Sequence, residues 1–247
     1  MRLIVDAHAH TISSGHSYST IQEMAQAACS KGIEMLAVTD HGPALNGAPA
    51  LIYFTNLKAI PEKINGVKIL KGVEANIIDY TGRTDMPDEI LKKLDYAIAS
   101  LHEYCITPST TKEHTQALVN ALKNPYIDVV GHPGNPHYQV DIEAVVKAAK
   151  ENGKLIEINN HSFSVRTGSE RNCKEFVLKC KEMGVKLVCG SDAHISFDVG
   201  RFGKVLKLFE ECGVTEDLVI NTSVEKFYEY LKEKKERLGR RIAEYCR

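Results

Sequence analysis

The chain has 247 residues, of which 43% are hydrophobic and 26% are charged, and this composition excludes a disordered chain or a coiled coil. Its formal net charge of −1 disfavours a nucleic-acid partner, because dedicated nucleic-acid-binding proteins usually carry a basic excess. No stretch approaches the roughly 18 apolar residues of a membrane span, so we expect no membrane partner. The sequence leaves the oligomeric state open.

The seven cysteines are odd in number and include no Cys-x-x-Cys pair. This pattern disfavours a disulfide framework and a zinc ribbon, and free thiols suit a reducing cytosol. The apolar run Leu3–Val5 is too short for the core of a signal peptide. We therefore expect a cytoplasmic protein.

Short apolar runs predict strands, and a segment with helical spacing follows each of them. The runs, in chain order, are Leu3–Val5, Met35–Thr39, Lys68–Val73, Tyr96–Ser100, Val129–Gly131, Leu155–Ile158 and Lys186–Cys189. The helices are predicted over residues 20–31, 53–64, 87–94, 111–123, 141–152, 169–183, 200–211 and 224–237. Capping boxes are predicted at Thr20 and Glu23, Thr110 and Glu113, and Thr167 and Glu170, and Gly32, Gly153 and Gly184 stand where helices should end.

Nearly continuous apolar strands that alternate with helices indicate a parallel sheet covered by helices. Seven such units favour an α/β barrel that resembles the (β/α)8 type. The alternative, an open doubly wound sheet, usually carries a glycine-rich phosphate loop after its first strand. Here the first strand runs into Asp6-Ala7-His8-Ala9-His10 instead.

Histidines and carboxylates gather where the predicted strands end, which is where a parallel βα barrel places its active site. Eight of the ten histidines lie at or just after a strand end, namely His8, His10, His16, His41, His102, His132, His161 and His194. Glu74 and Asp192 lie there too. The pairs His8/His10 and Asp192/His194 have i, i+2 spacing, which puts both side chains on one face of a strand. Imidazole and carboxylate ligands suit zinc, manganese or iron, so we predict a metal site.

For three other polar residues near these motifs the sequence leaves two roles open, and for three more it predicts only a structural position. Asp6 and Asp40 either orient ligand imidazoles or serve as turn carboxylates. His161 is either a polar wall residue or a proton donor. Of the remaining candidates, we expect His137 at the surface, His114 solvated on its helix, and Cys105 as a buried thiol.

The motif set resembles the PHP (polymerase and histidinol phosphatase) family, and most of all its bacterial YcdX-type phosphatases. The shared features are the His-x-His motif, the Thr39-Asp40-His41-Gly42 turn, Glu74 within Gly72-Val73-Glu74-Ala75-Asn76, the run Gly131-His132-Pro133-Gly134-Asn135-Pro136, Glu157-Ile158-Asn159-Asn160, and the terminal Ser191-Asp192-Ala193-His194. The likeness extends from about residue 4 to about residue 232. It implies a single PHP domain over residues 1–247, folded as a distorted, TIM-like (β/α)7 barrel.

The resemblance also implies a trinuclear metal site, with zinc as the expected ion and manganese or iron as alternatives. His8, His10 and Asp192 would hold one ion, and Glu74 would bridge it to a second ion completed by His102 and His132. His16, His41 and His194 would hold the third. All nine positions carry the expected residue type, whereas His161 stands where a small polar residue is expected.

Three divalent ions bring six positive charges, and the nine ligands supply only two negative ones because the histidines bind as neutral imidazoles. An anion with several oxygens, such as a phosphate ester, best balances that excess. We therefore expect a metal-dependent phosphatase that hydrolyses a small phosphorylated substrate, a phosphomonoester, by metal-activated hydroxide. Glu74, Asp192 and His161 are the predicted catalytic residues.

Three arginines are candidates for substrate binding, and three other functions are alternatives to the phosphatase. Arg166, Arg171 and Arg201 follow the last two predicted strands, and guanidinium groups suit phosphate recognition. The alternatives are a PHP-type phosphodiesterase or nuclease and a histidinol-phosphate phosphatase. A more remote third alternative is a non-catalytic sensor of a phosphorylated ligand.

Overall fold

The computed structural model describes residues 1–245, with side chains up to residue 240, and shows a nearly closed barrel of seven parallel strands. In spatial order the strands are β1 (Val5–Ala9), β2 (Met35–Val38), β4 (Val67–Asn76), β5 (Tyr96–Ser100), β6 (Val129–Val130), β7 (Leu155–Asn159) and β8 (Leu187–Gly190). The backbone N–H of His10 donates to Ala193 O and that of Asp192 donates to His8 O, each at 2.9 Å, so β8 returns to β1. The predicted (β/α)7 barrel is confirmed.

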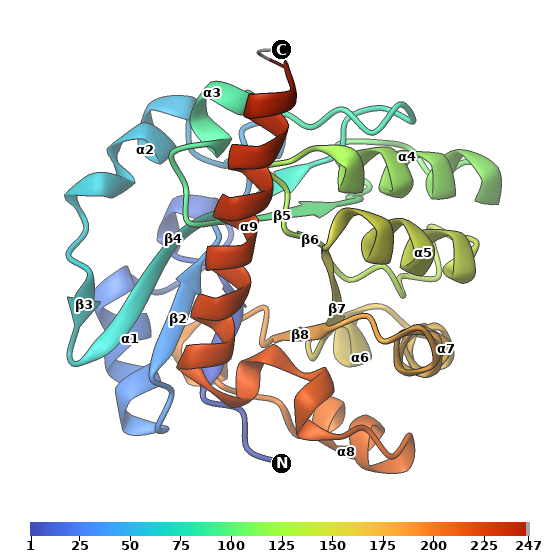
Figure 1. Cartoon of the computed structure of the whole chain (residues 1–247). Coiled ribbons are helices and arrows are strands. Elements are labelled where there is room, and N and C mark those ends of the chain that lie inside the picture. The colour runs from blue at the N-terminus through green and yellow to red at the C-terminus, as the bar shows by residue number, and fades with distance from the viewer. Residues whose placement is uncertain (246–247) are drawn as a thin grey trace.

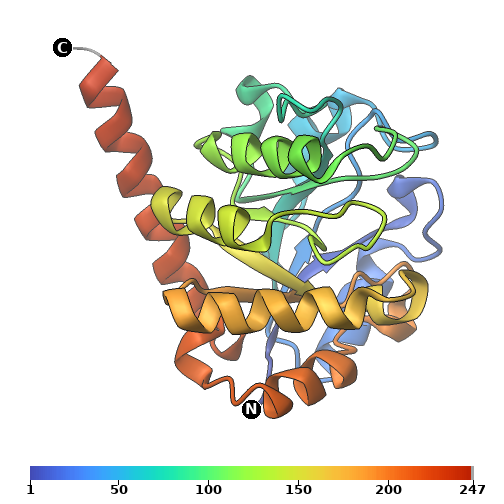
Figure 2. The same ribbon diagram turned by 90° about the vertical axis from the view of Figure 1, so that its right-hand side faces the viewer.

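Helices cover the outside of the barrel and one of its ends (Figure 1). They are α1 (Ile21–Ser30), α2 (Leu51–Asn56), α3 (Asp88–Leu91), α4 (Thr111–Lys123), α5 (Ile142–Asn152), α6 (Ser162–Val165), α7 (Ser169–Met183), α8 (Gly203–Glu211) and α9 (Val224–Tyr245). The long helices α4, α5 and α7 stack side by side, while α9 crosses the end of the barrel where the strands begin (Figure 2). Among residues 1–245, every helix is too short or too polar for a membrane crossing.

The predicted helix over 53–64 is wrong in its second half. The chain leaves α2 through a short 3-10 turn and forms β3 (Lys63–Ile64), which pairs antiparallel with β4. Asn65 and Gly66 have φ of 52° and 81° and connect the two strands. Positive φ at both turn positions is what an Asn-Gly hairpin turn provides, so this dipeptide overrides the helical spacing.

Two further local predictions are also wrong. The capping box at Thr167 and Glu170 does not form, because the N-cap of α7 is Gly168 rather than Thr167. Gly168 has φ of 89°, and no side chain makes a capping hydrogen bond at this end of α7. His114 is 1% exposed rather than solvated. Its Nε2 accepts from Ser109 N at 2.7 Å and its Nδ1 lies 2.9 Å from Gln139 O, so the ring ties two loops to α4.

A one-residue bulge in β1 turns the His-x-His motif toward the barrel interior. Val5 and Ala7 pack in the interior with the apolar face of α9. Between Asp6 and Ala9, three steps along β1 pass only two steps along β2. The extra residue reverses the in-out alternation, so His8 and His10 point inward above Val5 and Ala7, as bulges near active sites commonly re-aim side chains.

The barrel interior changes from apolar to polar along the strands. At the end where the strands begin, Tyr96, Ile98 and Leu155 pack against Phe227 and Leu231 of α9. Phe227 and Leu231 are buried in this contact, whereas Tyr228 on the same helix is 42% exposed. At the other end the interior positions carry the predicted metal ligands.

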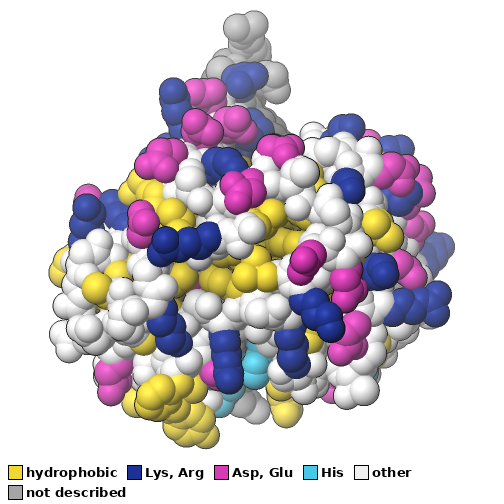
Figure 3. Space-filling model, turned by 90° about the horizontal axis from the view of Figure 1, so that it is seen from below, with side chains coloured by type: hydrophobic (Ala, Val, Ile, Leu, Met, Phe, Trp, Pro, Cys, Tyr) yellow, Lys and Arg dark blue, Asp and Glu magenta, His cyan; other side chains and the backbone are white. Residues whose placement is uncertain are grey.

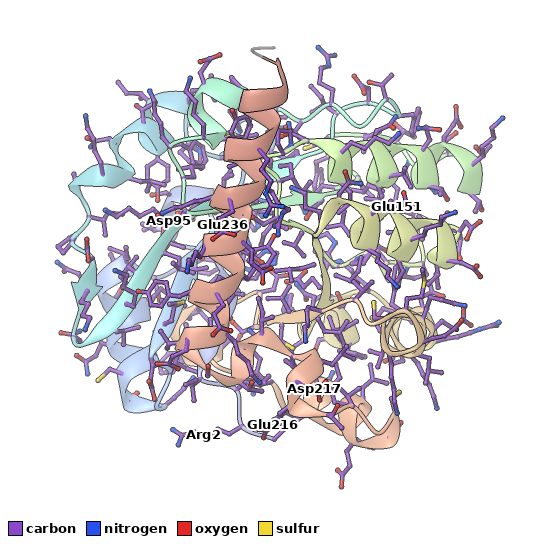
Figure 4. All side chains as sticks on the ribbon, in the orientation of Figure 1. Arg2, Asp95, Glu151, Glu216, Asp217 and Glu236 are labelled. Atoms are coloured by element: carbon purple, nitrogen blue, oxygen red, sulfur yellow. The ribbon has the colours of Figure 1, made fainter. Side chains whose placement is uncertain are left out.

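A buried ion pair fastens α9 to the barrel. Asp128, which is fully buried just before β6, accepts from Lys234 Nζ at 2.7 Å, from Tyr230 OH at 3.1 Å and from Ala97 N at 2.8 Å. Lys234 Nζ also lies 3.4 Å from the carbonyl of Asp95, a residue beside α9 in Figure 4. These contacts hold the apolar face of α9 over the open end of the strands.

A groove of about 1560 Å³ runs between α9 and the segments around α2 and α3. Its lining includes eight lysines, namely Lys58, Lys68, Lys71, Lys92, Lys93, Lys232, Lys234 and Lys235, against four acidic residues. The near-neutral composition of the whole chain conceals this basic region. The groove meets β4 at residues 68–71, on the side where the strands begin, whereas Glu74 lies toward the other end of β4.

Candidate metal centre

The structure brings all nine predicted ligands into one connected cluster at the carboxyl ends of the strands. His8 lies in β1 and Glu74 in β4, and the other seven follow the ends of β1, β2, β5, β6 and β8, namely His10, His16, His41, His102, His132, Asp192 and His194. The cluster includes three groups whose ligand atoms lie within 4.8 Å of one another: His8, His10 and Glu74; His41, Glu74 and His102; and His10, His41 and His194. Histidine side chains reach the surface beside Lys and Arg side chains (Figure 3).

Glu74 lies at the middle of this cluster, 1% exposed. Its Oε2 is 3.3 Å from His8 Nε2 and 2.9 Å from His41 Nδ1. Its Oε1 is 3.0 Å from His132 Nε2 and 3.3 Å from His102 Nε2. Each carboxylate oxygen therefore faces a different set of imidazoles, which is the arrangement needed to bridge two cations.

Asp192 and two further histidines extend the cluster beyond Glu74. Asp192 Oδ1 lies 3.2 Å from His10 Nε2, and His194 Nε2 lies 3.0 Å from His16 Nε2. The rings of His16 and His41 have centroids 5.1 Å apart. Asp192 has φ of 55°, a left-handed conformation that aims its carboxylate back into the barrel.

The donor set fits divalent metal ions. The Nδ1 atoms of four histidines face an oxygen acceptor: His8 faces Glu157 Oε1 at 2.7 Å, His16 faces Ser14 O at 3.1 Å, His102 faces Asn76 Oδ1 at 2.7 Å, and His194 faces Asp192 O at 2.9 Å. A proton on Nδ1 leaves a lone pair on Nε2 of a neutral imidazole. The Nε2 atoms meet in pairs, His8 with His10 at 3.1 Å and His102 with His132 at 3.2 Å. Two ligands about 2.05 Å from a tetrahedral zinc ion lie roughly 3.3 Å apart, so a cation would turn this lone-pair repulsion into coordination.

An unpaired ring nitrogen supports the same conclusion. His41 Nδ1 is buried and has no hydrogen-bond partner among the described residues, although Glu74 Oε2 lies 2.9 Å away. Buried polar atoms are rarely left unpaired in native structures. A cation bound to this imidazole would satisfy the buried nitrogen.

The electrostatics of the cluster also favour bound cations. Burial raises the pKa of Glu74, but His8, His102 and His41 outweigh it and hold the pKa well below its ordinary value. Burial and the nearby His41 and His194 hold the pKa of His10 well below its ordinary value. Burial and Arg166 lower the pKa of His132 to about 4. Glu74 is thus ionised and the imidazoles of His10 and His132 are neutral, which are the forms that bind metals.

The residues that orient the ligands were assigned no role from the sequence. Glu157 contacts His8, Asn76 contacts His102, and Ser14 Oγ lies 3.2 Å from His10 Nδ1. Asn76 follows Glu74 by two residues and shares its inward face, so strand alternation is the signal that could have identified it.

Asp6 and Asp40, which the sequence left between two roles, serve as turn carboxylates. Asp6 accepts from the backbone N–H of Ser191 at 2.9 Å and of Gly200 at 2.8 Å. Asp40 accepts from Thr11 N and from Ser14 Oγ, each at 2.7 Å. Neither contacts an imidazole ring among the interactions of the described residues, and Asp40 reaches His10 only through Ser14.

Of the predicted arginines, Arg166 is the one the structure brings to the cluster. Its Nη1 lies 3.5 Å from Asp192 Oδ2 and donates to Ser162 Oγ at 3.0 Å. Arg171 has an 87% exposed side chain paired with Glu175, and Arg201 has a 72% exposed side chain paired with Asp198. Neither of these two contacts a residue of the cluster among the interactions of the described residues.

The other predicted residues fall around the cluster. His161 is half-buried, and its ring centroid lies 6.0 Å from that of His194. His137 is exposed, as predicted, and pairs with Glu103. Cys105 is half-buried rather than buried, and burial raises the pKa of its thiol to about 11, so it stays protonated near neutral pH.

The sequence matches the family model of the PHP domain over residues 6–161. It is 63% identical over 241 residues to a probable phosphatase of Acetivibrio thermocellus, covering 98% of this chain and 100% of that protein. It is 60% identical over 241 residues to a probable phosphatase of Thermoanaerobacter sp. strain X514, covering 97% of this chain and 98% of that protein.

Solved structures with the same fold share little sequence. A histidinol phosphate phosphatase from Lactococcus lactis, complexed with zinc, L-histidinol and phosphate, superposes with a TM-score of 0.63 at 18% identity, covering 87% of this chain and 95% of that one. The family model spans more than half of the sequence, and close relatives align over nearly all of it. The chain belongs to the PHP-domain family.

Proposed function

We propose that this protein is a metal-dependent phosphatase that hydrolyses the phosphomonoester of a small molecule. The cluster built around Glu74 is the observation that carries the proposal, because it gathers nine metal-binding side chains of which only two are anionic. Relatives named probable phosphatases, at 60% identity or more, support the same reaction.

We infer three metal positions in this cluster, with zinc as the proposed ion. His8, His10, Asp192 and Glu74 would hold the first, Glu74, His102 and His132 the second, and His16, His41 and His194 the third. Divalent ions held there lower the pKa of water and offset the charge of a phosphate ester. The role of the protein is to hold these ligands in fixed positions, so that each ion is restricted to one coordination geometry.

Arg166 is proposed to bind the phosphate of the substrate. Its guanidinium lies 3.5 Å from Asp192 Oδ2 and its side chain is 17% exposed, so it can reach an anion at the cluster without leaving its position. We expect Arg166→Ala to raise KM about 10- to 100-fold, the effect of losing a hydrogen bond to a charged group. Steady-state kinetics on a phosphomonoester measure the change.

Arg171→Ala is the matched control, because it removes an equal charge from an exposed position. We expect its KM to stay within twofold of that of the unsubstituted protein. An unchanged KM for Arg166→Ala would remove Arg166 from the phosphate site.

His161 is proposed to act on the leaving group. Burial lowers the pKa of His161, so its imidazole is mainly neutral near pH 7 and can donate one ring N–H to the leaving oxygen. We expect His161→Ala to slow hydrolysis of an alkyl phosphate about tenfold, and of an aryl phosphate hardly at all, because a phenolate leaves without such help. Equal losses on both substrates would contradict this role.

A substrate panel separates the monoesterase from the nuclease or phosphodiesterase alternative. The lysine-lined groove lies at the end of the barrel where the β-strands begin, away from the cluster. A nucleic acid bound in this groove would therefore not pass the proposed metal positions. We expect turnover of phosphomonoesters and little cleavage of a single-stranded oligonucleotide. Histidinol phosphate belongs in the panel as one candidate monoester.

A further inference from the structure

The buried carboxylate of Glu157 touches two histidines that belong to different metal positions. Its Oε1 lies 2.7 Å from His8 Nδ1, and its Oε2 accepts the backbone N–H of His132 at 2.7 Å. The residue is 3% exposed. Glu157 stands in β7, which contributes none of the nine ligands, so its contacts reach β1 on one side and the end of β6 on the other.

The space around Glu157 is shaped for these two contacts. A Cβ atom on Gly190 of the neighbouring β8 would lie 2.5 Å from Glu157 Oε1 and 2.3 Å from His8 Cβ. Only glycine therefore leaves room for the carboxylate and the imidazole to meet. Asn159 Nδ2 donates weakly to Glu157 Oε2 at 3.4 Å and to Asp192 Oδ2 at 3.2 Å, which links the same carboxylate to a third ligand.

The contact with His132 holds an unusual backbone conformation. His132 has φ of 31°, in the left-handed region that residues with a side chain rarely adopt. Such conformations persist when neighbouring groups fix them. The Glu157 Oε2 contact fixes the N–H of His132 in the position where its Nε2 reaches Glu74 Oε1 at 3.0 Å.

We propose that Glu157 is a positioning residue that fixes ligands of the first and second metal positions at the same time, and leaves the third position independent. This inference rests on the proposed function. The carboxylate sets the tautomer and ring angle of His8 and the backbone of His132. A single side chain thereby sets the spacing of the two positions that Glu74 bridges.

Glu157→Gln tests the proposal, because a carboxamide of the same size has only one acceptor oxygen. Its NH2 group must then face either His8 Nδ1–H or the His132 N–H. We expect zinc affinity at two positions to fall 10- to 100-fold, the usual effect of losing a partner of a metal-ligating histidine. At a free zinc concentration that just fills the unsubstituted protein, the variant should hold about one ion in place of about three, measured by elemental analysis.

Two control variants distinguish a loss of two ions from the loss of a single ion and from a general loss of stability. Asn76→Ala removes a side chain that contacts only His102 among the nine proposed ligands, so it should lower the zinc content by about one ion per chain. Asp128→Asn weakens the barrel at the α9 end, so it should lower the melting temperature and leave the zinc content unchanged. If Glu157→Gln does not fold, Glu157→Asp replaces it, because the shorter side chain cannot span both contacts.

The outcomes separate this inference from the proposed function. Full zinc content and unchanged affinity in Glu157→Gln, with an active unsubstituted protein, would overturn the role of Glu157 alone. Equal weakening of all three positions would also overturn it. Fewer than two ions and no hydrolysis in the unsubstituted protein would overturn the proposed function instead.

Discussion

Glu74→Ala is expected to abolish phosphatase activity and to empty two metal positions. Both carboxylate oxygens face imidazole nitrogens at 2.9 to 3.3 Å, so the substitution removes the group shared between two sets of ligands. Metal ions supply several kcal/mol of transition-state stabilisation, and a loss of about 4 kcal/mol corresponds to about a thousandfold in rate. We therefore expect kcat to fall at least about a thousandfold, with zinc content dropping from about three ions to about one.

Kinetics and elemental analysis of the same preparation measure both effects. Glu74→Gln preserves the size of the side chain and removes its charge, and it should lose activity to a similar extent. Glu103→Gln is the matched control, because this exposed carboxylate near the cluster pairs with His137 and with none of the nine ligands. Near-normal rate and metal content in Glu74→Ala would show that the ligand assignment is wrong.

Lys234→Ala is expected to cause the largest loss of stability. The ammonium group is 8% exposed and lies 2.7 Å from Asp128 Oδ2, which is fully buried. Removing one partner of a buried ion pair leaves the other charge unpaired, at a cost of about 3–5 kcal/mol. Chemical denaturation should show this decrease in the free energy of unfolding, while zinc content in the folded protein stays unchanged.

Lys235→Ala removes the neighbouring exposed lysine and serves as the control. We expect it to change the free energy of unfolding by less than about 0.5 kcal/mol, as surface substitutions usually do. A change below about 1 kcal/mol in Lys234→Ala would show that the pair with Asp128 does not fasten α9. A similar loss in both variants would point to the helix itself rather than the pair.

The barrel and its ligand cluster could be predicted because both follow from strong local patterns. Apolar runs placed the seven parallel strands, and strand ends in such a barrel converge on one region. The pair His8 and His10 was recognised by spacing alone. The bulge that turns the pair inward was not predicted, because an extra residue in one strand is visible only against the register of its neighbour β2.

The failures have a common physical cause, which is that tertiary partners decide what a polar side chain does. His114 has the spacing of a solvated helix residue, yet Ser109 and Gln139 from separate loops bury it. Glu157 belongs to a recognised motif, but its partners His8 and His132 lie 149 and 25 residues away along the chain, so its role was not predicted. Arg166 follows the end of α6 and Arg171 lies in α7, five residues further on, yet Arg166 reaches Asp192 whereas Arg171 pairs with Glu175 at the surface.

Zinc content of the purified protein, measured together with hydrolysis of an aryl phosphate, tests the central claim most directly. We expect about three ions per chain and turnover that disappears with a chelator and returns with added zinc. Firmly fewer than two ions after replenishment, or no hydrolysis of any phosphate ester, would contradict a metal-dependent phosphatase built on these nine residues.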